Sequence, residues 1–456
     1  MTTADFWSND PYFDEPEPIS LDGGSTSRGV LWHGVSPRWG HAMHSMCSYH
    51  GMFPARLAHY FIQAYTDKGG TVLDPFSGRG TTALEARLDG RKAIANDLSP
   101  LAYVLTRSKA QVPTWEAINR FIDEIERDCP TAIGDLDDVS PDIRLLFHPR
   151  TLSQLVYLKG RLLARPLPEF TAEEIMTAGA VAGILHGNHR ADGSSAYLSV
   201  SMPNTFSMSP GYVKKYIAQN GLTLPDQDVF ECLRDKVARM YADSVSGPAG
   251  RVFNHDAIDL LNGQALRRGS IDLVLTSPPY LKVVNYGTAN WIRLWWLGLD
   301  GVSRQAGEGR KTLDALLDHN HTYERYRDFI GGFLRGVSRV LKPTGIAAVV
   351  IGDVAGPSGT SALAERIWHD LGDDSDLVLL DMVEDQLAAQ TKVSRIWGDT
   401  KGNATDRDCV LVLGQKSGSP RSARVDIDWT ERYKDAGPDA AHERARRHVS
   451  RSIARS

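Results

Sequence analysis

The sequence contains few cysteines, and they are far apart. Cys47, Cys129, Cys232 and Cys409 form no C-x-x-C pair and show no zinc-ligand spacing. A disulfide framework or a cysteine-based metal site needs such spacing, so we predict neither, and no metal cofactor.

The sequence also lacks a long apolar run and an excess of basic residues. No stretch of about 18 uncharged apolar residues occurs, so no membrane span is expected. The N-terminus has no basic stretch followed by an apolar one, which argues against a secretory signal. A net charge of −5 argues against a polycation that coats nucleic acid but allows a local basic groove. We expect a cytoplasmic protein.

The composition is that of a globular protein large enough for two or three structural units, with 456 residues, 42% of them hydrophobic. Strand-like and helix-like segments alternate in two regions, and a mostly helical region separates them. We therefore predict an α/β fold with an inserted helical domain. The expected divisions are a flexible acidic leader over 1–30, the first part of the α/β domain over 31–108, the helical insertion over 109–247, the second part over 248–415, and a polar, basic tail over 416–456.

The first motif is a strand that runs into a glycine-rich turn, DPFSGRGTT, and then into a helix. Gly78 and Gly80 allow positive φ and let a ligand approach the main chain closely. Such a turn could serve NAD, FAD or S-adenosylmethionine, although the spacing differs from the dinucleotide G-x-G-x-x-G. The next strand ends at Asp97, about 20 positions on, where an acid suits the ribose hydroxyls of an adenosine. The alternative for Asp97 is a simple acid at a helix N-terminus.

The second motif is Thr276-Ser277-Pro278-Pro279-Tyr280, which follows a buried strand. Two prolines fix φ near −65° and remove two backbone donors, so the turn is stiff. The Ser277 side chain and the Pro278 carbonyl can accept both hydrogens of an –NH2 group, and Tyr280 offers a flat face for an extruded base. A purely structural diproline turn is the alternative.

Together the two motifs resemble the amino-methyltransferase superfamily of DNA methyltransferases, whose catalytic signature is (D/N/S)PP(Y/F/W). The resemblance covers roughly residues 45–105 and 250–415. It implies a Rossmann-like class I sheet with S-adenosyl-L-methionine as cofactor. The Ser-Pro-Pro-Tyr variant is commonest among N4-cytosine enzymes of restriction–modification systems.

The resemblance also implies roles for individual residues. Phe53 and Pro54 match the segment at the methionine end of the cofactor, and Asp256 matches the acid near the adenine ring. Ser277, Pro278, Pro279 and Tyr280 match the catalytic turn. The cofactor loop consists of Asp74, Phe76, Ser77, Gly78, Gly80, Thr81 and Thr82, with Asp97 as the ribose-binding acid.

The family places a target-recognition domain at a long break such as 109–247. Double-stranded DNA is the implied partner, and a restriction–modification setting would add a cognate endonuclease. A solvated helix face is the alternative for each group of cations in this insertion. The candidate DNA contacts there are Arg144, Arg150, Lys159, Arg161, Lys214 and Lys215.

The implied reaction is direct in-line methyl transfer to the N4 amine of a flipped cytosine. Adenine N6 is the alternative target, and an RNA guanine-N2 methyltransferase or a catalytically silent DNA-binding regulator are further alternatives. Methylation of a ring carbon would need a nucleophilic cysteine after a proline, and none of the four cysteines follows one. Trp291, Trp295 and Trp296 could line the DNA cleft or fill core, and we expect core for most of them.

Overall fold

The structure, a computed structural model, describes most of the chain between residues 32 and 429. The predicted acidic leader over 1–30 and the arginine-rich end of the tail lie outside the described residues. Those described are 32, 35, 39–49, 53–189, 195–202, 209–280, 286–299, 322–352, 354–356, 359–385, 408–424 and 426–429.

A seven-stranded sheet forms the centre of the α/β domain, with the strand order β3-β2-β1-β4-β5-β9-β8. The first five strands in this order are parallel, whereas β9 is antiparallel to both β5 and β8. The strands are β1 (Thr71–Asp74), β2 (Lys92–Asn96), β3 (Arg251–Phe253), β4 (Ile271–Thr276), β5 (Leu341–Gly352), β8 (Leu377–Asp385) and β9 (Asp408–Gln415). A separate hairpin pairs β6 (Val354–Gly356) with β7 (Gly359–Ser361).

Helices cover both faces of this sheet, which explains why its strands are almost continuously apolar. On one face, α2 (Ala55–Tyr65) and α3 (Thr81–Leu88) pack in a cluster that includes Val72 of β1. On the other face, α11 (Ala257–Asn262), α15 (Tyr323–Val340) and α16 (Leu363–Leu371) pack in a cluster that includes Leu73. Neighbouring residues of β1 thus point to opposite layers, as the alternation of side chains along a strand requires. The predicted α/β fold is confirmed.

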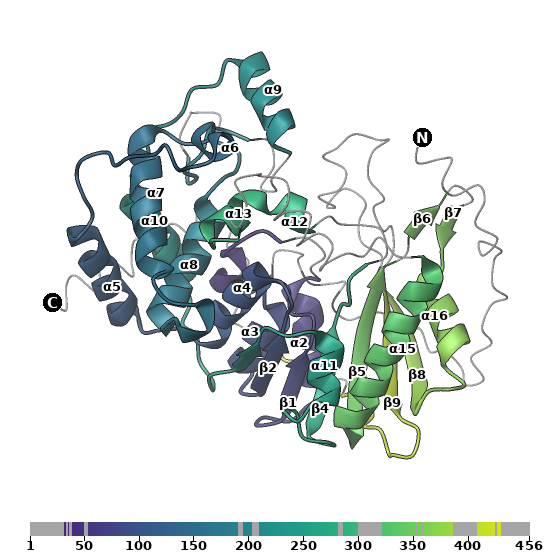
Figure 1. Cartoon of the computed structure of the whole chain (residues 1–456). Coiled ribbons are helices and arrows are strands. Elements are labelled where there is room, and N and C mark those ends of the chain that lie inside the picture. Colours follow the sequence, from purple (N-terminus) through teal and green to yellow (C-terminus); the bar gives the residue numbers. More distant parts are fainter. Residues whose placement is uncertain are drawn as a thin grey trace.

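The insertion is helical, as predicted. In Figure 1 its helices form a body beside the sheet. A proline in the first turn and a glycine directly after the last are typical helix ends, and α9 has both, with Pro210 after Ser209 at the start and Gly221 at φ +56° at the end. The elements are α5 (Trp115–Arg127), α6 (Pro141–Arg144), α7 (Pro149–Leu162), η3 (Leu167–Glu169), α8 (Ala172–Ile184), α9 (Pro210–Asn220) and α10 (Val229–Met240).

These helices do not stand alone, because they share one apolar core with neighbouring elements of the α/β domain. The neighbours are α4 (Pro100–Ala110), η2 (Ala42–Ser45), and α13 (Trp291–Trp296), which follows the short α12 (Tyr286–Ala289). Trp291, Trp295 and Trp296 are all buried, and the Trp296 indole donates a hydrogen bond to the Ala178 carbonyl at 3.0 Å. The expectation that these tryptophans fill core is confirmed. Within the described ranges, no helix is long and apolar enough to cross a membrane.

The segment after β9 differs from the expected peripheral tail, because its first part returns to α2. Arg421 and Arg424 both form ion pairs with Asp67, the former at 2.6 Å. The ring of Trp429 lies 5.2 Å from that of His59 and 5.3 Å from that of Trp39, measured between centroids. Residues 416–424 and 426–429 therefore belong to the folded domain, through contacts with partners more than 350 positions earlier.

Candidate active site

The glycine-rich turn between β1 and α3 has the backbone that its glycines predict. Gly78 has φ +50° and Gly80 has φ +80°, and Gly80 is the residue before α3. A Cβ atom on Gly80 would lie 2.7 Å from the Cα of Thr106, and one on Gly78 would lie 3.4 Å from the Tyr49 ring. The positive φ therefore favours glycine at both positions, and at Gly80 the lack of space does so as well.

Asp97 at the end of β2 anchors this turn. One of its carboxylate oxygens accepts a hydrogen bond from the Gly78 N–H at 2.8 Å, and the other accepts from the Ser99 N–H at 2.9 Å. Burial raises the pKa of Asp97 to about 6, although these two hydrogen bonds oppose the shift. Ser99 is the residue that caps α4, so Asp97 lies two positions before the cap of this helix. Its ribose contact stays a prediction.

The two motifs meet at the carboxyl edge of the sheet, because β1 and β4 are parallel neighbours with Leu73 opposite Val274. The Thr276 hydroxyl donates to a carboxylate oxygen of Asp74 at 2.6 Å. That oxygen also accepts from the Phe76 N–H at 3.2 Å. Asp74 is only 2% exposed, and burial raises its pKa to about 7. The Asp74 side chain thus points at the strand that carries the diproline turn.

The diproline turn lies directly after this contact. Ser277 and Pro279 are half-buried, and Pro278 is buried. Tyr280 is buried, with 8% of its surface exposed. The stacking of a base on Tyr280 and the acceptor role of Ser277 stay predictions.

Other predicted cofactor residues are arranged around the same edge. Phe53 is buried in the cluster that contains β1 and β4, and Pro54 is the residue before α2. Asp256 is exposed and follows β3, where one carboxylate oxygen accepts from the Ile258 N–H at 2.8 Å and caps α11. Thr81 and Thr82 form the buried first turn of α3, and Phe76 and Ser77 lie in the turn itself.

Sequence reasoning assigned no role to three residues that shape the site. Asn96 is fully buried, and its amide donates to the Pro75 carbonyl at 3.1 Å and the His255 carbonyl at 3.0 Å. Thr106 donates to the Gly78 carbonyl at 3.2 Å. Thr276 is the third. A polar residue at the end of an apolar strand is a usable signal for Asn96 and Thr276, whereas nothing in the sequence distinguishes Thr106.

Beneath the turn, α3 carries a buried acid between two histidines. Glu85 lies 2.7 Å from the His44 Nε2 and 3.6 Å from the His59 Nδ1, and His59 also lies 3.1 Å from Asp89. Burial alone would raise the pKa of Glu85, but the hydrogen bonds from the histidines prevail and lower it to about 2. Burial would likewise lower the pKa of His59, but its bonds to Asp89 and Glu85 raise it to about 10. This network holds η2, α2 and α3 together.

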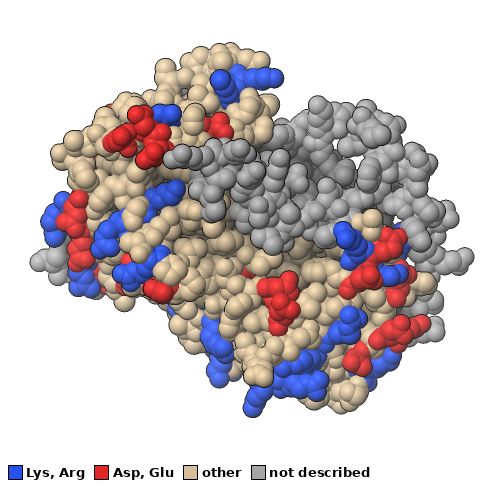
Figure 2. All heavy atoms as spheres, viewed as in Figure 1, with Lys and Arg blue, Asp and Glu red and all other residues tan. Residues whose placement is uncertain are grey.

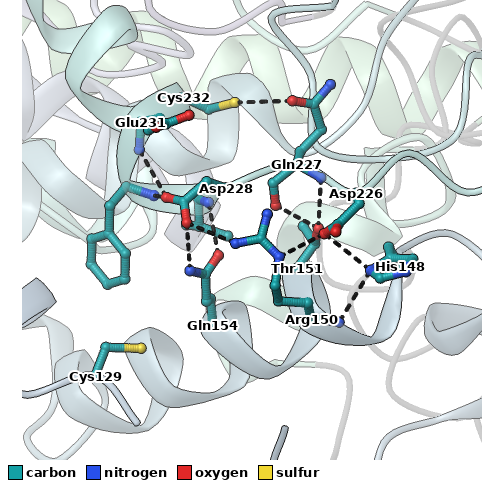
Figure 3. A network of polar contacts seen from close by, with 12 residues as sticks. Cys129, His148, Arg150, Thr151, Gln154, Asp226, Gln227, Asp228, Glu231 and Cys232 are labelled. Atoms are coloured by element: carbon teal, nitrogen blue, oxygen red, sulfur yellow. Dashed lines mark hydrogen bonds and ion pairs between the residues drawn. The ribbon is translucent and has the colours of Figure 1, made fainter. Parts of the chain in front are cut away.

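Two of the candidate DNA-contacting cations of the insertion form ion pairs within the protein. Arg150 lies 2.7 Å from Asp226 and 3.0 Å from Asp228, as Figure 3 shows. Arg144 lies 3.3 Å from Asp137. These two arginines are engaged within the protein, because the fold brings acids from other segments to them.

The remaining candidate cations differ among themselves. The Lys159 ammonium lies 4.6 Å from the centroid of the Trp295 ring. Arg161 is exposed on α7. Lys214 and Lys215 are exposed on α9, a helix with no acidic residue, and neither forms an ion pair with any other described residue.

The strand order, with one antiparallel strand inserted beside β5, together with a glycine turn after β1, defines the Rossmann-like fold of class I methyltransferases. Residues 21–105 match the model of the DNA methylase family of N6/N4 type. Over residues 21–105 the chain is therefore similar to DNA methylases of this family.

Two curated relatives are similar to parts of the chain. The type II methyltransferase M.BsoBI of Geobacillus stearothermophilus is 25% identical over 62% of this chain and 59% of its own length. The type II methyltransferase M.MjaII of Methanocaldococcus jannaschii is 32% identical over 15% of this chain and 13% of its own length. The chain thus matches less than two thirds of the length of either relative.

Among solved structures, TrmN from Thermus thermophilus aligns with 82% of this chain and 52% of its own, at 13% identity and a TM-score of 0.32. A similarity this low does not bear on function.

Proposed function

We propose that this protein transfers a methyl group from S-adenosylmethionine to an exocyclic amine of a base in double-stranded DNA. The observation that supports it best is the meeting of the two motifs at adjacent strand ends, joined by the Thr276–Asp74 hydrogen bond of 2.6 Å. An amine acceptor site and a cofactor site must adjoin for direct transfer, and the carboxyl ends of parallel strands are where such sites form.

The residues present fit the cofactor. At Gly78 and Gly80 no side chain would keep a cofactor away from the main chain of the turn. Asp97, at the end of the neighbouring strand, holds the turn by its hydrogen bond to the Gly78 N–H. Asp97 and Asp256 follow the adjacent strands β2 and β3, where carboxylates would face the ribose and the adenine amine. Phe53 would pack at the methionine end. When bound, S-adenosylmethionine supplies a methyl group that is activated by its positive sulfur.

The catalytic work falls to the diproline turn. Ser277 and the Pro278 carbonyl would accept the two amine hydrogens and so localise the nitrogen lone pair, which is otherwise delocalised into the base. Tyr280 would hold the flipped base by stacking. Because the cofactor already carries a good leaving group, orientation and lone-pair localisation provide most of the rate enhancement.

For the target base we propose cytosine N4, on the ground that serine precedes the two prolines. Adenine N6 is the second candidate, since the same pair of acceptors can bind its amine. The relatives are type II methyltransferases by name, which supports DNA as substrate without choosing the base.

For the DNA contact we propose α9. In Figure 1 this helix projects on the side of the molecule toward which the arrow of β5 points, and Figure 2 shows basic side chains at that tip. Besides Lys214 and Lys215, the helix exposes Tyr212, whose ring is stacked on that of Tyr216 with centroids 6.2 Å apart. Exposed lysines next to an exposed aromatic ring suit a phosphate backbone and its sugars.

The test is methylation of DNA of mixed sequence, and in parallel of total RNA, by the purified protein with isotope-labelled S-adenosylmethionine, followed by nucleoside mass spectrometry. We expect labelled N4-methylcytosine. Labelled N6-methyladenine alone would overturn the cytosine assignment but keep the reaction class. Label in RNA only, or cofactor binding without any transfer, would overturn DNA methylation.

A further inference from the structure

We propose that Thr276 is a positioning residue whose hydroxyl, bonded to Asp74, sets the distance between the cofactor loop and the catalytic turn. This inference rests on the proposed methyl transfer and deepens it. It adds to the site a residue that precedes the catalytic signature and touches neither substrate nor cofactor.

The geometry places this bond between the two motifs. Asp74 is the last residue of β1 and begins the loop, and Thr276 is the last residue of β4 and directly precedes Ser277. Their 2.6 Å hydrogen bond therefore joins the first residue of the glycine-rich motif to the first residue of the diproline motif, 202 positions away. No flexible segment intervenes on either side.

The bond lies in a rigid environment. Thr276 is fully buried, and Asp74 is almost fully buried. A second link runs parallel to it, since the Thr82 hydroxyl of α3 donates to the Leu275 carbonyl of β4 at 3.4 Å. A short bond to a carboxylate in such a dry place is stronger than one in water. The 3.4 Å link is longer and has only a carbonyl as acceptor, so the Thr276 bond is the stronger of these two side-chain links, and it extends the β1–β4 pairing to the strand ends.

The cofactor loop is also held by hydrogen bonds that do not involve Thr276, so loss of the Thr276 hydroxyl should affect turnover more than cofactor binding. Gly78 is held by Asp97 at 2.8 Å, and the Ser77 N–H donates to the Asn96 carbonyl at 2.9 Å. These anchors come from β2 and do not involve β4. Without the Thr276 hydroxyl, the loop should still bind cofactor, but the turn that carries Ser277 should lose its fixed separation from it.

The experiment compares Thr276→Val, which keeps the shape and loses the hydroxyl, with Thr276→Ser, which keeps the hydroxyl. Thr66→Val is the matched control. Thr66 is also fully buried and its hydroxyl accepts from the Arg91 Nε at 3.0 Å, but it lies before β1, at the opposite edge of the sheet. Turnover on DNA is measured together with cofactor affinity by calorimetry, on the full chain.

For Thr276→Val we expect kcat to fall by about 10- to 100-fold, as for a sub-ångström to 1 Å misplacement of reacting groups. Cofactor Kd should change by less than about threefold, and Thr276→Ser should recover kcat to within about threefold of the wild type. Thr66→Val should keep the wild-type kcat. If Thr276→Val does not fold, Thr276→Ala removes the same hydroxyl with less crowding of Asp74 and carries the same expectation.

Two results would overturn the positioning role. One is an unchanged kcat in the folded hydroxyl-free variant, and the other is an equal loss of kcat and of cofactor affinity, as general damage to the domain would give. A wild-type protein that binds cofactor but transfers no methyl group would instead overturn the proposed function, and with it this inference.

Discussion

Replacing Gly80 with alanine tests whether the turn between β1 and α3, which we propose as the cofactor loop, needs glycine for its backbone alone or also for close packing. Gly80 has φ +80°, and an added Cβ would lie 2.7 Å from the Thr106 Cα and 3.0 Å from its hydroxyl. The chain supplies a matched control. Gly69 also has φ +80°, but a Cβ there would have no atom within 4 Å.

The expected magnitudes follow from these two environments. Gly69→Ala should lower the free energy of unfolding by about 1–2 kcal/mol, the penalty of a left-handed conformation for an L-residue. Gly80→Ala should lose the same amount plus about 1–3 kcal/mol, because the Cβ meets the backbone of α4, which cannot rotate away as a side chain could. The difference between the two variants is therefore the penalty of the contact with Thr106.

Urea unfolding followed by tryptophan fluorescence measures both free energies, and calorimetry measures the affinity of each variant for S-adenosylmethionine. Gly80→Ala should also weaken cofactor binding, whereas Gly69→Ala should leave it at the wild-type value. Equal losses of stability in the two variants would show that the close approach to Thr106 is not maintained in solution. An unchanged cofactor affinity in Gly80→Ala would refute the role of this turn as the cofactor loop.

Three further predictions concern other parts of the site and its surroundings. Ser277→Ala should reduce turnover with nearly unchanged cofactor affinity, whereas Asp97→Ala should mainly reduce cofactor affinity because the Gly78 N–H loses its acceptor. Steady-state kinetics measures turnover and calorimetry measures cofactor affinity, and an equal loss of cofactor binding in both variants would contradict the division into a catalytic turn and a cofactor loop. Lys214→Gln combined with Lys215→Gln should reduce the slope of log affinity for DNA against log salt by up to about 2, at about 0.9 per phosphate contact, and an unchanged slope would exclude α9 from the interface. The ion pairs of His59 raise its pKa to about 10 from an ordinary value of 6.5, so their contribution to stability is complete below about pH 6.5 and disappears as the pH rises through 10. The difference in unfolding free energy between wild type and His59→Gln, measured with urea, should therefore shrink from pH 6 to pH 10. A constant difference would contradict the ion pairs.

The sequence alone determined the local elements and the chemistry that they carry. Gly78 and Gly80 after an apolar strand specify a turn with positive φ, and the two prolines after Ser277 specify a stiff one. The helix over 210–220 could be bounded to the residue because its N-terminal proline and its C-terminal Gly221 act on the backbone locally. These features are readable because each depends on residues within a few positions of one another.

Only the tertiary structure decided which distant residues meet. The placement of β1 beside β4 brings Thr276 to Asp74, and no pattern in either motif encodes that bond. In the same way, acids at 226 and 228 neutralise Arg150, which the sequence offered as a phosphate contact, and the tail brings Trp429 back to α2. The physical reason is common to all three: strand order and helix packing are fixed by burial of apolar surface over the whole domain. The polar partners of a side chain are then whichever groups that packing places within hydrogen-bond distance.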